Sequence, residues 1–223
     1  MRLFHLALAG AIALSACSST GEKPETELSF LTTAIKSALA TLKRRGHKSA
    51  SPLKLLTRAQ LANIKTRLMM AHVEKTGSWA ALSLTARNRA YETYFSVDRK
   101  SVTLEYGILA ETRGLAGDLM ESDISGVVKA LRGGPLSYSR SYAWLNGEDH
   151  LQKARFGCTM KIVGTEQIEI VQRSFKTRHL HEQCSGKSGQ FANDYWLAGR
   201  ETVKSRQWAG KDIGYVGTWL LVR

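Results

Sequence analysis

Residues 101–106 read SVTLEY and residues 166–172 read EQIEIVQ, and polar and apolar side chains alternate along most of both stretches. A period of two places successive side chains on opposite faces of a β-strand, so that one face packs against a core. Both stretches therefore predict half-buried strands of a sheet.

The same β-favouring composition extends through most of the chain after about residue 67. Turn-forming pairs such as Asn146-Gly147 and Gly164-Thr165 separate the segments, which favours antiparallel neighbours joined by hairpins. We expect one domain over residues 28–223, mainly β with a few helices (α+β) and built on a large curved antiparallel sheet. The expected strands are residues 69–74, 79–86, 91–97, 101–113, 138–146, 154–163, 166–175, 177–183, 201–208 and 214–222.

Three segments predict helices. Apolar residues recur at helical spacing between Glu25 and Arg45, which predicts an amphipathic N-terminal helix that Gly46 can end. Shorter helices are expected over Thr57–Ile64 and Ser122–Leu131. The long first helix fits either a cap on the domain core or, less well, a helix lying on a membrane.

The first seventeen residues read MRLFHLALAGAIALSAC, a short positive start followed by an apolar run and small residues. Leu14-Ser15-Ala16-Cys17 resembles a bacterial lipobox, which implies cleavage before Cys17 and acylation of that cysteine. Residues 1–16 are then a signal peptide and residues 17–27 a polar tether. Ser18 stands where Asp would resemble an inner-membrane retention signal, so the resemblance implies the outer membrane. An ordinary secretory signal is the alternative.

The composition is that of a folded, basic protein. Hydrophobic residues make up 43% and charged residues 23%, which excludes a chain disordered throughout. Lys and Arg number 32 against 19 Asp and Glu, a formal charge of +13. An exported protein with this charge meets anionic lipids, lipopolysaccharide phosphates and acidic polysaccharides, so we expect no nucleic-acid partner. A dispersed basic surface with no particular partner is the alternative.

Two cysteines remain after Cys17. Cys158 and Cys184 form a candidate disulfide, since an even pair in an oxidising compartment is normally bonded. A straight hairpin turning at Gly164-Thr165 would place Cys158 opposite residue 172, about 40 Å from Cys184. A bend near Lys176 would be needed to bring the two together.

Catalytic and metal-binding signatures are missing from the sequence. No GxSxG, HExxH, P-loop or zinc spacing occurs. His179 and His181 share one face of an expected strand, but two histidines facing solvent explain them better than a metal site. We therefore expect no enzymatic activity, no cofactor and no metal.

Two segments stand out as candidate binding sites. In residues 112–119, TRGLAGDL, Arg113 and Asp118 could pair across a turn, or Asp118 could cap a helix, and a structural use is favoured over ligand contact. Near the C-terminus, Trp196, Arg206 and Trp208 combine aromatic faces with a guanidinium, a combination that can bind sugars. Filling of a curved sheet's interior by these aromatics is the alternative.

The lipobox, TRGLAGDL, FANDYW, SRQW and the closing strand after GYVG, in this order, resemble the YjbF family of lipoproteins over about residues 54–223. The resemblance implies a strongly curved antiparallel sheet, a partly open barrel similar to the LolA fold. It also implies a role in capsule or exopolysaccharide loci without known chemistry. Residues 210–212 depart from the family, which commonly has Pro there.

We expect a periplasm-facing outer-membrane lipoprotein, anchored in the bilayer through acylated Cys17, that assists capsule or exopolysaccharide secretion or assembly. Acidic polysaccharide and polysaccharide-export proteins are the expected partners. A lipid or lipoprotein carrier with an apolar concave sheet is the second hypothesis, and a polysaccharide-modifying enzyme with two carboxylates about 5 to 9 Å apart is the third. The expected contacts are Arg113, Asp118, Trp196, Arg206 and Trp208.

Overall fold

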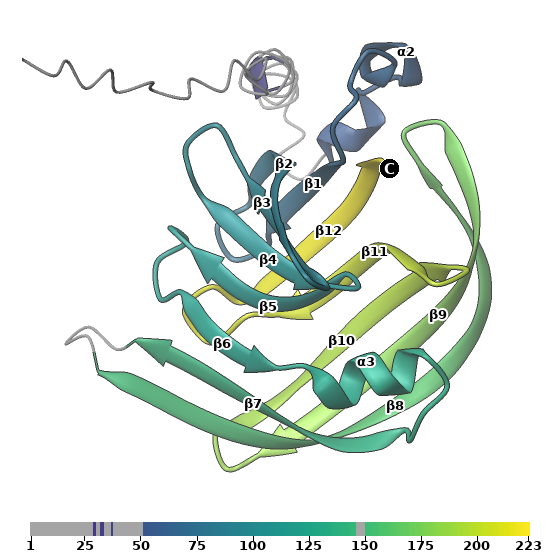
Figure 1. The fold of residues 1–223 in the computed structure, drawn as a ribbon. Helices are drawn as coiled ribbons and strands as arrows, with labels where there is room; N and C mark the ends of the chain where they lie inside the picture. The colour runs from purple at the N-terminus through teal and green to yellow at the C-terminus, as the bar shows by residue number, and fades with distance from the viewer. Residues whose placement is uncertain (1–28, 30–31, 34–36, 38–50, 146–149) are drawn as a thin grey trace, which may run out of the picture.

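The computed structural model describes residues 29, 32–33, 37, 51–145 and 150–223 (Figure 1). Twelve antiparallel strands form one sheet, accompanied by short helices, as the sequence predicts. The elements are η1 (Pro52–Lys54), α2 (Arg58–Leu61), β1 (Leu68–Val73), β2 (Ser78–Asn88), β3 (Tyr91–Phe95), β4 (Ser101–Glu105), β5 (Ile108–Arg113), β6 (Leu119–Asp123), α3 (Ser125–Leu131), β7 (Ser137–Leu145), β8 (Leu151–Ile170), β9 (Arg173–Gly186), β10 (Gly189–Ala198), β11 (Glu201–Trp208) and β12 (Tyr215–Val222).

The sheet curls until its two edge strands meet. The order β5-β4-β3-β2-β1-β12-β11-β10-β9-β8-β7-β6 leaves β5 and β6 at the edges. There, Leu119 N donates to Thr112 Oγ1 at 3.0 Å, and Arg113 Nη1 donates to the Leu119 carbonyl at 3.1 Å. The sheet is therefore a nearly closed barrel, whose curvature Figure 1 shows.

At β1, both faces of the sheet are packed, on different clusters. Met69 and Ala71 point into the barrel interior, whereas Leu68 and Met70 join an outer cluster with Leu61 of α2. This division follows the alternation of side chains along β1. The N-cap Thr57 and Gln60 form a capping box that sets the start of α2.

Helix α3 fills the interior beside β8–β10. Its apolar residues Val127, Ala130 and Leu131 pack against Leu180 and Tyr195. The expected start at Ser122 is wrong, because residues 119–123 form strand β6 and the helix begins at Ser125. Of the expected helix over residues 25–45, only residues 29, 32, 33 and 37 are described, and all four are helical. The rest of that prediction, together with the signal peptide and tether, lies outside the described residues.

One predicted strand and one predicted turn need correction. The single strand over residues 101–113 is a hairpin, broken at Tyr106-Gly107, where both φ angles are positive. The turn predicted at Gly164-Thr165 is wrong: β8 runs on to Ile170 and the chain turns at residues 171–172. Gly164 instead follows a bulge, since the register shifts between Ile162 and Gly164.

Candidate functional site

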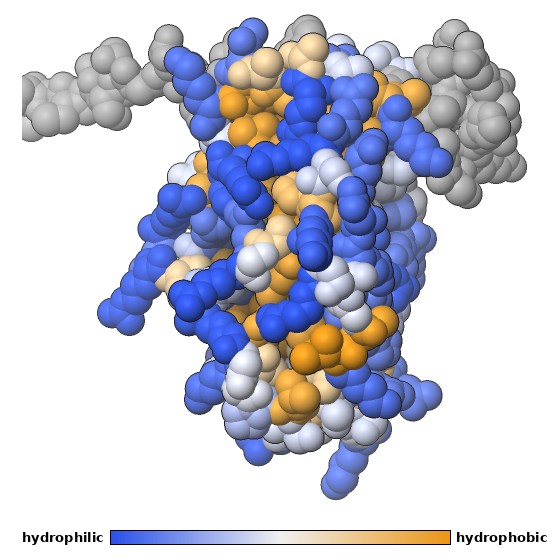
Figure 2. All heavy atoms as spheres, turned by 90° about the vertical axis from the view of Figure 1, so that its right-hand side faces the viewer, coloured by the Kyte–Doolittle hydropathy of each residue, from blue (hydrophilic) through white to orange (hydrophobic). Residues whose placement is uncertain are grey.

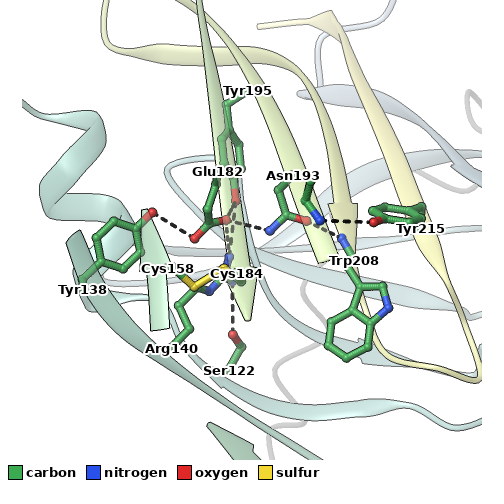
Figure 3. Close-up of a disulfide and its surroundings, with 11 residues drawn as sticks. Ser122, Tyr138, Arg140, Cys158, Glu182, Cys184, Asn193, Tyr195, Trp208 and Tyr215 are labelled. Carbon is green, nitrogen blue, oxygen red and sulfur yellow. Dashed lines mark hydrogen bonds and ion pairs between the residues drawn. A yellow bond between two sulfur atoms is a disulfide. The ribbon is translucent and has the colours of Figure 1, made fainter. Parts of the chain in front are cut away.

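A charged network occupies the middle of the barrel interior (Figure 3). Glu182, with 0% exposure, accepts four hydrogen bonds. Tyr138 donates to Oε1 at 2.9 Å, while Arg140, Asn193 and Tyr195 donate to Oε2 at 2.9, 2.6 and 2.7 Å. Four donors supply the hydrogen bonds that an ionised carboxylate needs away from water.

The surroundings of Arg140 keep its guanidinium charged. Burial lowers the pKa of Arg140, but Glu182 and the neighbouring tyrosines together outweigh burial and raise that pKa above its ordinary value. Burial raises the pKa of Tyr195, so its hydroxyl stays protonated and continues to donate. The network is therefore a fixed ion pair inside the sheet, with its polar groups turned toward one another.

The disulfide lies beside this network. Cys158 and Cys184 are direct partners across β8 and β9, with Cα atoms 4.1 Å apart, and their sulfurs are bonded. Because the hairpin turns seven residues later than predicted, at Val171-Gln172, no bend is required to join them. The carboxylate of Glu182 lies near the two sulfurs, so the three residues together have the atoms of a potential metal-binding group. A bonded cysteine offers no thiolate, so this group is not a metal site.

Trp208 is an interior residue. Its ring stacks on Phe191 at 4.4 Å and meets Tyr142, Trp144 and Phe156 edge-on at 5.4 to 5.7 Å. Its backbone N–H donates to Asn193 Oδ1 at 2.7 Å, which ties it to the buried network. The structure therefore packs Trp208, which is partly buried, against the interior core, as the interior-packing alternative expects.

Trp196 faces outward, but neither face of its ring is open. His179 stacks on one face at 4.4 Å, and Lys204 Nζ lies 3.8 Å from the ring centroid. The indole N–H donates to Glu166 at 2.9 Å. A sugar ring stacks on a free aromatic face, so it would first have to displace one of these neighbours.

Arg206 shares this outer face, on the next strand. Its cross-strand partner is Asp194, two residues before Trp196. The guanidinium makes two bonds of 2.7 Å to the Glu74 carboxylate, which raise the pKa of Arg206, and its central carbon lies 3.5 Å from the Tyr215 ring centroid. Its charge is thus already neutralised.

Asp194 joins the two histidines that the sequence singles out. Its Oδ1 lies 2.9 Å from His179 Nε2 and 2.9 Å from His181 Nδ1. Burial raises the pKa of Asp194, but these hydrogen bonds outweigh burial and the pKa is lowered. Both histidines therefore have a carboxylate partner on the outer face.

Arg113 and Asp118 stabilise the seam between β5 and β6. Asp118 accepts from Thr112 Oγ1, Gly114 N and Leu115 N at 2.6 to 3.0 Å, which closes its own loop. Arg113 forms an ion pair with a different carboxylate, that of Glu111, at 3.2 Å. The two residues have local structural contacts, and neither pairs with the other nor caps a helix.

The five predicted contacts thus occupy three places: the seam, the interior and the outer face. Sequence reasoning missed a more open feature, a hollow of about 450 Å³ beside the C-terminal end of α3. Its lining includes Arg132, Arg178 and Arg200. A second hollow of about 450 Å³ adjoins it, shares Arg200, and is lined by three more arginines and two glutamates.

Comparison with known proteins identifies relatives. The family described as "Group 4 capsule polysaccharide lipoprotein gfcB, YjbF" matches residues 34–221. No curated protein matches the sequence. The solved structure of the hypothetical lipoprotein YmcC from Escherichia coli K12 aligns with a TM-score of 0.67 and 20% identity, covering 74% of this chain and 88% of that one. A putative lipoprotein from Parabacteroides distasonis aligns at a TM-score of only 0.28, with 9% identity over 70% of this chain and 92% of that one.

Proposed function

Because this chain belongs to the YjbF family of group 4 capsule polysaccharide lipoproteins, we propose that it assists secretion or assembly of a surface polysaccharide by binding the polymer. In this proposal the protein is anchored in the outer membrane, faces the periplasm and is not an enzyme. Polysaccharide-export proteins are its further partners.

The anchor in this proposal is acylated Cys17, which lies outside the described residues. Each buried CH₂ contributes about 0.8 kcal/mol, and more than one acyl chain holds a protein stably on a bilayer. Within the described part of the chain, no helix is both long and apolar enough to cross a membrane. Acylation would therefore fix the domain to the membrane surface.

The observation that carries the proposal is the contrast between the filled middle of the barrel and the arginine-lined hollows at the surface. Arg140 and Glu182, at 1% and 0% exposure, fill the middle of the barrel together with an aromatic cluster. The two hollows that share Arg200 are lined by six arginines in all; Arg67 and Arg87 pair with Glu92 or Glu201, and the other four form no ion pair with a carboxylate of the described residues. We call these two hollows the basic rim. Binding of a polymer at the basic rim requires no displacement of core residues, and the positive charge of the rim suits an acidic polymer.

The middle of the interior supports a lipid carrier less well than the hollow of about 450 Å³ that Ala71, Leu82, Val102 and Val216 line within the interior cluster. An acyl chain in the middle of the concave face would have to displace a buried ion pair, leaving its charges without partners. Figure 2, which views the right-hand side of Figure 1, shows hydrophobic side chains in a broken line on a mainly hydrophilic face. Hydrophilic side chains interrupt this line along its length.

An acidic hollow at the seam also fits an acidic polymer poorly. It measures about 640 Å³ and is lined by Glu105, Glu111, Glu121 and Asp123. Four carboxylates would repel the acid groups of such a polymer. The basic rim is therefore the favoured contact.

The test is the distribution of acidic exopolysaccharide in a strain that lacks the protein, complemented with the wild-type chain or with Cys17→Ala. We expect less polymer at the surface and accumulation inside the envelope, restored by the wild type and poorly by Cys17→Ala. Unchanged polysaccharide in the deletion strain would contradict the proposed function. Acyl chains copurifying with the wild-type protein in stoichiometric amount would instead favour the lipid carrier.

A further inference from the structure

Three arginines from separate elements meet at one hollow. Arg132 directly follows α3, Arg178 lies on β9, and Arg200 stands in the turn between β10 and β11. The hollow of about 450 Å³ is within the range of small-ligand clefts, about 300–1,000 Å³. Its floor includes the buried residues Leu131 and Leu197.

Two of the guanidiniums are held in place by the fold. The central carbon of Arg132 lies 3.8 Å from the centroid of the Tyr106 ring. Arg178 Nη2 donates to the Leu131 carbonyl at 2.7 Å, at the C-terminal end of α3. Stacking and a single hydrogen bond leave most of the five guanidinium N–H groups of each arginine available to a ligand.

Charge at this hollow is unbalanced. No aspartate or glutamate is among its lining residues. Arg67, Arg140 and Arg206 each bond a glutamate. By contrast, Arg132, Arg178 and Arg200 form no ion pair with any carboxylate of the described residues, so a bound anion would supply the missing counter-charge.

The turn at Tyr106-Gly107, which bounds the hollow, packs closely against β11. Thr202 Oγ1 donates to the Tyr106 carbonyl at 2.9 Å, and the two residues line both hollows. Gly107 packs against Thr202 so closely that an added Cβ would lie 2.5 Å from the threonine Cβ. The turn that carries the Tyr106 ring and its stacked arginine is therefore tied to Thr202 of β11.

We infer that this hollow binds the carboxylate of an acidic sugar, and this inference rests on the proposed function. A guanidinium fork matches a planar carboxylate with two parallel hydrogen bonds, and three such forks surround one cavity. The second hollow, which shares Arg200, lies where the next sugar of the polymer would follow. An acidic polysaccharide would thus cross the rim with its acid groups on the arginines.

The test measures binding of oligogalacturonate to the full-length protein in detergent by calorimetry. We expect Arg200→Gln to weaken binding at least tenfold, since a charge-assisted hydrogen bond contributes that much. Lys187→Gln is the matched control, because it removes the same charge from an exposed turn residue outside both hollows. The methyl-esterified oligosaccharide, which lacks the charge, should bind at least tenfold more weakly.

Three results would overturn the inference: equal losses in Arg200→Gln and Lys187→Gln, equal binding of the methyl ester, or saturation of the site by inorganic phosphate in preference to oligogalacturonate. Complementation separates this inference from the proposed function. Normal export by an Arg178→Gln/Arg200→Gln protein in the deletion strain would overturn the inference and leave the proposed function standing. Normal export in the deletion strain itself, with binding intact in vitro, would refute the function alone.

Discussion

Replacing Glu182 by glutamine tests whether the interior is held by a charge pair. The substitution keeps the shape of the side chain but leaves the Arg140 guanidinium, at 1% exposure, without its counter-charge. It also places an amide NH₂ among side chains that donate hydrogen bonds to the carboxylate of the wild type. Breaking a buried pair from one side costs about 3–5 kcal/mol, and the free energy of unfolding of a domain is about 5–15 kcal/mol.

The assay is urea denaturation of the wild type, Glu182→Gln, Arg140→Gln and the double variant. We expect each single variant to lose about 3–5 kcal/mol and the double to lose at least 2 kcal/mol less than their sum, because it has no uncompensated charge. Glu74→Gln is the control, since its Arg206 partner is solvent-accessible and the pair should contribute less than about 1 kcal/mol. Additive losses, or a loss in Glu182→Gln no larger than in Glu74→Gln, would refute the reasoning.

Three further perturbations address other features. Replacing Cys158 and Cys184 by alanine removes a cross-link with a sequence separation of 26 residues. The free energy of unfolding, measured by urea denaturation without reductant, should fall by about 3.5 kcal/mol. A loss below about 1 kcal/mol would contradict this. Asp194 has a lowered pKa in the folded protein, so its contribution to stability is full above about pH 4 and is lost as the pH falls through that lowered pKa. Asp194→Asn should therefore reduce the loss of stability below pH 4. An unchanged dependence of the free energy of unfolding on pH would count against this. Gly107→Ala should lower the thermal midpoint more than Gly77→Ala, because both glycines have positive φ but only Gly107 meets a side chain; equal shifts would disprove the close contact.

Hydrophobic alternation was enough to predict the class of fold, because most strands expose one face and bury the other. The misplaced β8–β9 turn is an error of one kind, because no glycine or asparagine signals it. The β8–β9 hairpin turns on Val171 and Gln172 at φ of 47° and 59°, a conformation uncommon for these residues, so the glycine at 164 was the more attractive but wrong choice.

The candidate site was harder to predict than the sheet. Arg132, Arg178 and Arg200 are separated along the chain and become neighbours only when α3, β9 and the β10–β11 turn pack together. Adjacent glycines at 133 and 199 mark two of them as turn residues, but nothing local distinguishes them from other arginines. Trp196 and Arg206 lie on neighbouring strands of the outer face, whereas Trp208 packs inward and its backbone N–H donates to the Asn193 side chain.

The position of β12 in the sheet has a consequence for how the chain folds. Tyr215–Val222 pairs with both β1 and β11, so the last strand joins β1–β5 on one side to β6–β11 on the other. Until β12 forms, the two halves of the sheet lack the strand that hydrogen-bonds to both of them. Pairing between strands far apart in the sequence, such as β1 and β12, is intrinsically slow. A chain delivered N-terminus first therefore cannot complete the barrel until residues 215–222 have emerged.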